Sequence, residues 1–212
     1  MKTSNVLLQP VVGVSLAQAW GEHLDSAMLK FGISDTDNEA ILKQRVCMFL
    51  ANVCKETDKL TKLEEDLWYR AERIVVVWPS LFKTVEQAKP YEKNAQKLAN
   101  YVYGQPGNQL GNTQPNDGYY FRGRGPVHTT GRYNYKVASK KLDQDFMTHP
   151  ELIAQPEFGS QAAALFWKEK NINRFADTGN VKLVENAISP GKLGLNDVMI
   201  YYKTFCRIFD TN

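Results

Sequence analysis

Apolar residues recur with helical spacing along most of the chain. One stripe, spaced at intervals of 4, 4, 3 and 4 residues, consists of Leu16, Trp20, Leu24, Ala27 and Phe31. Such spacing places side chains on one face of an α-helix, whereas the strict alternation that marks a strand is sparse here. The pattern therefore predicts a mainly α-helical fold.

Capping residues and helix breakers indicate where the helices begin and end. Gly32 ends the first helix, and the polar cluster 35–38 supplies an N-cap for the second. Thr84 and Gln87 form a capping-box pattern. The predicted helices cover 15–31, 39–57, 70–77, 84–89, 93–103, 131–142, 157–169, 179–188 and 195–209. Between them, 104–126 is rich in Gly, Asn and Gln and is predicted to be a long irregular loop of functional importance.

Length and composition fit one folded domain. The chain has 212 residues without a linker, repeat or low-complexity segment, so we expect a single catalytic domain over 1–212. Its net charge of +3 comes from 26 basic and 23 acidic residues, without the basic clusters of a nucleic-acid-binding protein. No apolar run approaches the roughly 18 residues of a membrane span, so we expect neither nucleic acid nor a membrane as partner.

The cysteines and histidines are few and widely spaced. Cys47 and Cys54 lie seven residues apart in one predicted helix, a rise of about 10 Å, which is beyond disulfide reach. Together with Cys206 they are predicted to be buried free thiols. Because the three histidines lie far from the cysteines, no metal site is expected.

The N-terminal segment partly resembles a secretion signal, with an apolar stretch over 6–16 followed by Ala17-Gln18-Ala19. However, Gln9 and Pro10 interrupt that stretch, and the helical stripe continues directly across the supposed cleavage site. We therefore expect folded protein here and no signal peptide.

An acid stands at the end of the apolar stripe in the helix predicted over 39–57. The stripe consists of Leu42, Val46, Phe49 and Val53, and its next position is Glu56. Burial among apolar neighbours raises the pKa of a carboxyl, as a general acid near neutral pH requires. The same pattern also fits a helix end at which a glutamate simply reaches water.

A second acidic group, Glu64-Glu65-Asp66, follows nine residues later. On one straight helix Glu56 and Glu65 would point about 180° apart, because each residue turns the helix by about 100°. A shared cleft therefore requires a bend between them, although no Gly or Pro lies in that interval. Taken alone, an acidic triplet is typical of a solvated face.

A third feature is the segment 119–126, Tyr-Tyr-Phe-Arg-Gly-Arg-Gly-Pro, with 128–135 after it. It lacks the third glycine of a dinucleotide-binding motif and the lysine of a P-loop. Its glycines allow close backbone approach, its aromatic residues offer flat faces, and its Asn, Thr and Arg side chains offer hydrogen bonds. This mixture suits a sugar; the alternative is a tight structural turn with core tyrosines.

In combination, these segments resemble glycoside hydrolase family 19. The resemblance rests on segments 54–57 (CKET), 63–69 (LEEDLWY), 101–104 (YVYG), 121–126 (FRGRGP) and 130–135 (TGRYNY). It covers about residues 12–205, and the short interval between the acids is more similar to the bacteriophage endolysin branch than to plant chitinases. The resemblance implies a lysozyme-like helical fold and a second helix that ends near Thr57.

The resemblance also implies a role for each matching residue. Glu56 matches the general acid, which protonates the leaving glycosidic oxygen, and Glu65 matches the general base, which takes a proton from the attacking water. Thr130 matches a hydroxyl that holds this water, and Asn134 an amide that binds an N-acetyl sugar. Further substrate contacts are expected from Tyr120, Arg124, His128 and Tyr133. The family inverts the anomeric centre, so the two acids should be roughly 6.5–9.5 Å apart, and no cofactor is implied.

Several positions depart from the family pattern. Lys55 replaces a usual His, Asp66 a usual Asn, and His128 a common Gln. Segment 189–191 replaces an Asn-Gly-Gly turn, and Val198 a frequent Arg, so no role is transferred to either. Lys55 and Asp66 flank the two acids and would shift their pKa values in opposite directions.

The implied function is an endolysin-type hydrolase that cleaves β-1,4 bonds between N-acetylated amino sugars of peptidoglycan. Arg122, Arg124 and Arg132 and the net positive charge would suit this anionic polymer. A chitinase, a non-catalytic wall- or sugar-binding protein and a toxin delivered by another cell are the alternatives. We expect a monomer that stays in the host bacterial cytoplasm until its release and then acts on the wall in the periplasm.

Overall fold

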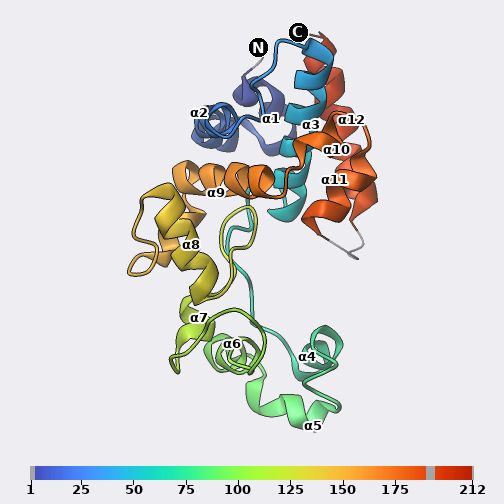
Figure 1. The fold of residues 1–212 in the computed structure, drawn as a ribbon. Helices are drawn as coiled ribbons and strands as arrows, with labels where there is room; N and C mark the ends of the chain where they lie inside the picture. Colours follow the sequence, from blue (N-terminus) through green and yellow to red (C-terminus); the bar gives the residue numbers. More distant parts are fainter. Residues whose placement is uncertain (1–2, 190–193, 212) are drawn as a thin grey trace. The chain divides into compact units, whose positions relative to one another are not determined.

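Helices make up nearly all the regular structure of the computed structural model, which describes residues 3–189 and 194–211 (Figure 1). The mainly α-helical prediction is therefore confirmed. The chain divides into two compact units. The first comprises the chain up to Leu63, 125–127 and the chain from Ala154 onward, and the second comprises 64–124 and 128–153. A single catalytic domain over 1–212 stays a prediction.

The first unit is built around one helix whose second half is buried on all sides. Its helices are α1 (Ser4–Val12), α2 (Val14–Lys30), α3 (Glu39–Glu56), α9 (Pro156–Glu169), α10 (Asn173–Ala176), α11 (Val181–Ile188) and α12 (Leu195–Thr211). In α3 every residue from Val46 to Cys54 is buried, and α1, α10, α11 and α12 all contact this helix. A helix that is apolar all round belongs in a core. The end of α3 is therefore held on several sides.

The N-terminal segment is folded, as expected, although its helix α1 was not predicted. Leu7 and Leu8 are fully buried, and α1 packs against α2. In the predicted stripe of α2, Trp20 and Leu24 are buried. Across the described ranges of the chain, no helix combines the length and the apolar character that a membrane span requires.

The second unit has shorter helices around a smaller core. Its elements are α4 (Ala71–Val77), α5 (Val85–Ala88), η1 (Lys89–Tyr91), α6 (Ala95–Tyr103), α7 (Asp117–Tyr120) and α8 (Arg132–Leu142). The 3-10 turn η2 (Pro150–Ala154) follows α8 in the chain. The core consists of Leu67, Ala71, Ile74, Phe82, Ala88, Leu98, Ala99 and Val102. Long irregular segments connect these helices, including most of the loop predicted over 104–126.

The predicted helix boundaries are confirmed to within a few residues. Asn38 caps α3, since its side chain accepts a hydrogen bond from the Ile41 amide at 3.1 Å. Thr84 accepts one from the Gln87 amide at 3.4 Å. The four-residue helices α5, α7 and α10 are too short for hydrophobic periodicity to be visible, and of these only α5 was predicted, from its cap.

The cysteines are free thiols, as predicted. Cys47 and Cys54 are buried, whereas Cys206 is only half-buried, so the prediction of burial is wrong for that residue. Burial raises the pKa of Cys54 to about 12, which keeps this thiol neutral under ordinary conditions.

Candidate active site

The chain bends directly after Glu56, without glycine or proline. Thr57 is fully buried, and its hydroxyl donates to the Val53 carbonyl at 2.6 Å and accepts from the Leu60 amide at 2.8 Å. Residues 58–60 then take φ values of 47°, 62° and 65°, a left-handed conformation that costs energy for residues with a side chain. The buried Thr57 and Leu60 side chains stabilise this turn. The helix therefore ends where the family resemblance implied.

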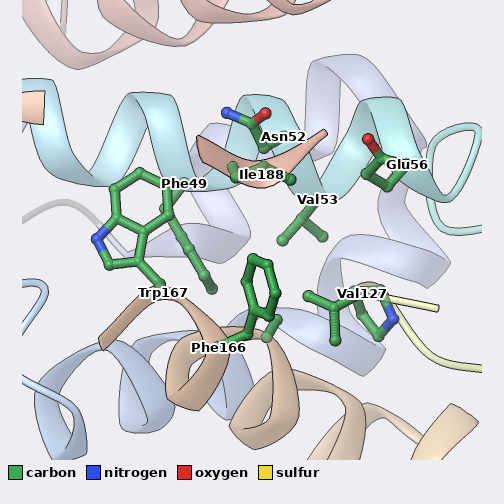
Figure 2. A pocket seen from close by; sticks show the side chains of 10 residues that line it. Phe49, Asn52, Val53, Glu56, Val127, Phe166, Trp167 and Ile188 are labelled. Carbon is green, nitrogen blue, oxygen red and sulfur yellow. The ribbon is translucent and has the colours of Figure 1, made fainter. Parts of the chain in front are cut away.

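Glu56 continues the buried face of α3. Figure 2 shows it one turn beyond Val53, beside an apolar cavity of about 20 Å³, which has room for roughly one water molecule. The cavity is lined by Phe49, Asn52, Val53, Glu56, Pro126, Val127, Ala163, Phe166, Trp167 and Ile188. The Glu56 side chain is only 15% exposed. The alternative of a helix end that simply reaches water is therefore wrong.

Two polar side chains contact the Glu56 carboxylate, and one of them, Lys55, also contacts a second carboxylate. Lys55 Nζ lies 2.6 Å from Glu56 Oε1, and the Ser189 hydroxyl donates to the same oxygen at 2.9 Å. Lys55 Nζ also lies 3.2 Å from Glu185 Oε1. Burial alone would lower the pKa of Lys55, but its hydrogen bond with Glu56 and its attraction to both carboxylates outweigh this, and its pKa is raised. The ammonium therefore stays charged.

Sequence reasoning missed Glu185 and Ser189. They lie one turn apart at the end of α11, where Val181 and Val184 are also buried. Glu185 thus interrupts an apolar stripe, the same signal that drew attention to Glu56. Val198, at the position of a frequent family arginine, is fully buried. Of the segment 189–191, only Ser189 lies within the described residues.

Glu65 is held in a different way, by backbone groups and a phenol. Its amide donates to the Gly123 carbonyl at 2.9 Å, and the Gly123 amide donates to Glu65 Oε2 at 3.3 Å. The Tyr103 hydroxyl donates to Glu65 Oε1. Burial and the charge of Glu65 raise the pKa of Tyr103, so the phenol stays a hydrogen-bond donor. No role for Tyr103 was predicted, although it belongs to one of the family segments.

Gly123 lets the Glu65 carboxylate and the Thr130 hydroxyl approach the same point. A Cβ atom at Gly123 would lie 3.1 Å from Thr130 Oγ1 and 3.3 Å from Glu65 Oε2. The Thr130 hydroxyl itself donates to the His128 carbonyl at 2.8 Å. A carboxylate and a hydroxyl side by side are what a general base with a water-holding partner requires.

The acidic triplet is not one solvated face. Glu64 Oε2 lies 2.5 Å from Arg122 Nη2, and Glu64 Oε1 lies 3.2 Å from Arg124 Nε. Asp66 accepts a hydrogen bond from the Trp68 amide at 2.9 Å. Each of the three acids therefore has separate partners.

The arginines near this segment hold the scaffold together. Arg124 is 4% exposed and donates to the Tyr120 carbonyl at 2.9 Å, and Arg122 pairs with Glu64. Arg132 donates two hydrogen bonds to Asp117, from Nη2 to Oδ1 at 2.6 Å and from Nε to Oδ2 at 2.7 Å. All three arginines are thus paired with carboxylates. The expectation that they offer positive charge to an anionic polymer is not supported, and Arg124 has little surface for a substrate contact.

Asp117 organises the loop that precedes it. Its Oδ2 accepts the amides of Thr113 and Gln114 at 2.8 and 2.9 Å, and Arg132 donates from α8. Burial would raise the pKa of Asp117, but the hydrogen bond and charge of Arg132 and the two amides lower it overall. The Arg132 amide donates to Asn112 Oδ1 at 2.8 Å. Hydrogen bonds from Arg132 to Asn112 and Asp117 therefore connect the Asn-rich loop to the start of α8.

The remaining predicted binding residues lie in the same unit as Glu65. Asn134 is exposed on α8, and its amide donates to the Thr130 carbonyl at 2.7 Å. Tyr133 is 59% exposed and Tyr120 41% exposed. His128, with φ of 47°, lies in the turn that joins Arg124 to Thr129. Their contacts with a substrate stay predictions.

The two predicted acids belong to different units, Glu56 to the first and Glu65 to the second. The distance expected for an inverting mechanism therefore stays a prediction. Where the chain is described, no group of three or more His, Cys, Asp or Glu side chains is arranged to hold a metal ion.

Comparisons with known proteins agree on a family. The model of a family described as "Chitinase class I" matches residues 84–183, which include Thr130 and Asn134 but neither Glu56 nor Glu65. A glycosyl hydrolase family 19 domain-containing protein of Haemophilus influenzae is 29% identical over 164 residues, which cover 76% of this chain and 78% of that protein. Both matches are to glycoside hydrolase family 19, and they support a glycoside hydrolase.

Further similar proteins are named as chitinases, and one of them is a solved structure with the same fold. An acidic endochitinase of Petunia hybrida is 39% identical over 75 residues, 35% of this chain and 27% of the endochitinase. The solved structure of chitinase C from Streptomyces griseus HUT6037 matches with a TM-score of 0.61 at 17% identity, covering 99% of this chain and 77% of that one. The lysozyme-like helical fold of the family is thereby confirmed.

Proposed function

We propose that this protein is a family 19 glycosidase of the endolysin type, a peptidoglycan hydrolase that cleaves β-1,4 bonds between N-acetylated amino sugars. The observation that carries its catalytic part is the Glu65 carboxylate beside the Thr130 hydroxyl, brought together over Gly123. A water molecule held there has both a base and an orienting hydroxyl.

In the proposed reaction, Glu65 accepts a proton from this water while the water oxygen attacks the anomeric carbon. Glu56 donates its proton to the leaving glycosidic oxygen as the carbon–oxygen bond breaks. Attack from the face opposite to the leaving group inverts the anomeric centre. Lys55 and Ser189 contact the Glu56 carboxylate, and both stabilise the charge that it gains. Asn134 is proposed to bind the N-acetyl group.

Peptidoglycan is favoured as substrate by the nine-residue interval between the acids and by the net charge of +3. We propose that a monomer waits in the host bacterial cytoplasm and acts on the wall after its release. Chitin is the second candidate. It is favoured by relatives whose names are endochitinase and chitinase, and by the pairing of Arg122, Arg124 and Arg132 with carboxylates.

Mass spectrometry of the fragments released from purified peptidoglycan, with insoluble chitin in parallel, tests this proposal. We expect the wild type to release disaccharide-peptides with hydrated reducing ends. Glu56→Gln should release them about 10²–10⁴-fold more slowly, because the amide N–H is too weakly acidic to protonate the leaving oxygen.

Glu39→Gln is the matched control, since Glu39 is exposed in the first turn of the same helix and should leave the rate unchanged. Release from chitin alone would assign the chitinase function. Binding without release from either polymer would support the non-catalytic alternative. A Glu56→Gln variant with more than about a tenth of the wild-type rate would contradict the assignment of the general acid.

A further inference from the structure

The Lys55 ammonium is shared between two carboxylates at the end of α3. It lies 2.6 Å from Glu56 Oε1 and 3.2 Å from Glu185 Oε1. The Glu185 side chain is only 3% exposed, and within the described residues neither of its oxygens accepts a hydrogen bond. A buried carboxylate without a charge partner is costly. The positive charge of Lys55 therefore compensates the negative charge of the buried Glu185.

The backbone at Gly194 closes over this pair. A Cβ atom there would lie 2.4 Å from Lys55 Cε and 3.0 Å from Glu185 Oε1, so a side chain at this position would displace the Lys55 ammonium. The same α11 that carries Glu185 also provides Ser189, whose hydroxyl reaches Glu56 at 2.9 Å. The end of α11 thus contacts both residues: Ser189 donates a hydrogen bond to Glu56, and Glu185 provides a negative charge beside Lys55.

Other helices packed on α3 bring few charges to this end. Helix α1 carries no titratable side chain, and α10 places Asp177 on Arg45, nearer the start of α3. Helix α12 contributes the buried Val198 and the phenol of Tyr201, whose pKa is raised chiefly by burial and further by the charges of Asp58 and Asp197. The charges that act on Lys55 are those of Glu56 and Glu185.

We propose that Lys55 and Glu185 are positioning residues that set the pH range over which Glu56 acts. An ammonium in contact with a carboxyl favours its ionised form, which cannot donate a proton. The second carboxylate offsets the ammonium, so Glu56 recovers its proton in each catalytic cycle while Lys55 holds its side chain in place. This inference rests on the proposed role of Glu56 as the general acid.

The test is the dependence of kcat on pH, measured on the polymer that the wild type cleaves. Lys55→Met should move the alkaline limb of the profile to higher pH, by about one unit, because Glu56 loses the cation that favours ionisation. Glu185→Gln should move the same limb to lower pH, because the ammonium then acts on Glu56 alone. The double variant should return towards the wild-type profile.

Lys43→Met is the matched control, because Lys43 forms an ion pair from the same helix with Asp210, at 2.7 Å, away from Glu56. It should leave the profile unchanged. Glu185→Gln keeps the size of the side chain and carries the test if Lys55→Met does not fold. An alkaline limb that stays in place in the folded single variants overturns this inference. Failure of the proposed function gives a different result, namely turnover that survives Glu56→Gln.

Discussion

The two proposed catalytic acids are held by different kinds of structure. Glu56 stands at the end of a buried helix, and its partners are the side chains of Lys55 and Ser189. Glu65 stands on an irregular segment and is held by the backbone of Gly123 and the hydroxyl of Tyr103. Charge surrounds the first acid, whereas hydrogen bonds and close backbone approach surround the second.

This difference indicates what each position tolerates. A helix end fixes the direction of a side chain through its core packing, so changes near Glu56 should act mainly through charge. An irregular segment is fixed only by the contacts that cross it, so changes near Glu65 should act mainly through geometry.

The second unit should depend strongly on the ion pair of Asp117. Asp117→Asn leaves the Arg132 guanidinium without its counter-charge, so we expect a loss of about 3 kcal/mol in the free energy of unfolding, towards the low end for a buried pair because Arg132 is partly exposed. Urea denaturation at pH 7 measures this loss. Asp143→Asn, at an exposed left-handed position in the same unit, is the control and should change little.

The same pair predicts a pH dependence. Because the pKa of Asp117 is lowered in the folded protein, its stabilising contribution is complete above the usual value of 3.8 and is lost as pH falls through the lowered pKa. Wild type and Asp117→Asn should therefore converge in stability in strong acid. Equal stability at pH 7 would contradict a structural role for the pair.

Gly123→Ala tests the geometry around Glu65. The added Cβ would lie 3.1 Å from Thr130 Oγ1 and 3.3 Å from Glu65 Oε2, so one of these groups must shift by a few tenths of an ångström. We expect kcat to fall about tenfold to a hundredfold. The backbone conformation of Gly123 is not left-handed, so thermal stability should stay close to the wild type. Unchanged kcat in this variant would show that the Glu65–Thr130 arrangement does not matter.

The smallest expected effect concerns the turn after Glu56. Thr57→Val keeps the shape of the side chain but removes its hydrogen bonds with Val53 and Leu60. We expect a loss of about 1–2 kcal/mol in the free energy of unfolding, measured with urea. Thr61→Val, which removes an exposed hydrogen bond to the Asp58 carbonyl, is the control. A loss no greater than that of the control would mean that the buried leucine alone holds the turn.

Helical periodicity predicted most of the fold because each long helix buries one side against the core. The same periodicity located Glu56, since an acid on an apolar stripe is visible in the sequence. It would also have located Glu185, which interrupts the stripe of α11 in the same way.

The environment of Glu65 could not be predicted in this way. Its partners Tyr103 and Gly123 lie 38 and 58 residues away in the chain, and local sequence patterns do not predict such long-range contacts. The bend over 58–60 uses left-handed residues that are not glycine, which removes the usual sequence signal. The pairing of the arginines with Glu64 and Asp117 is likewise a tertiary property, so basic side chains in the sequence gave a misleading indication of surface charge.

The central claim is that Glu56 and Glu65 act as acid and base on opposite faces of the sugar. The most direct test is proton NMR of the products, recorded before the new reducing ends equilibrate, with the polymer that the wild type cleaves. Hydrolysis of a β-1,4 bond should first release the α-anomer, because water attacks from the face opposite to the leaving group. Initial release of the β-anomer would show retention and would contradict the assignment of Glu65 as the base that activates water.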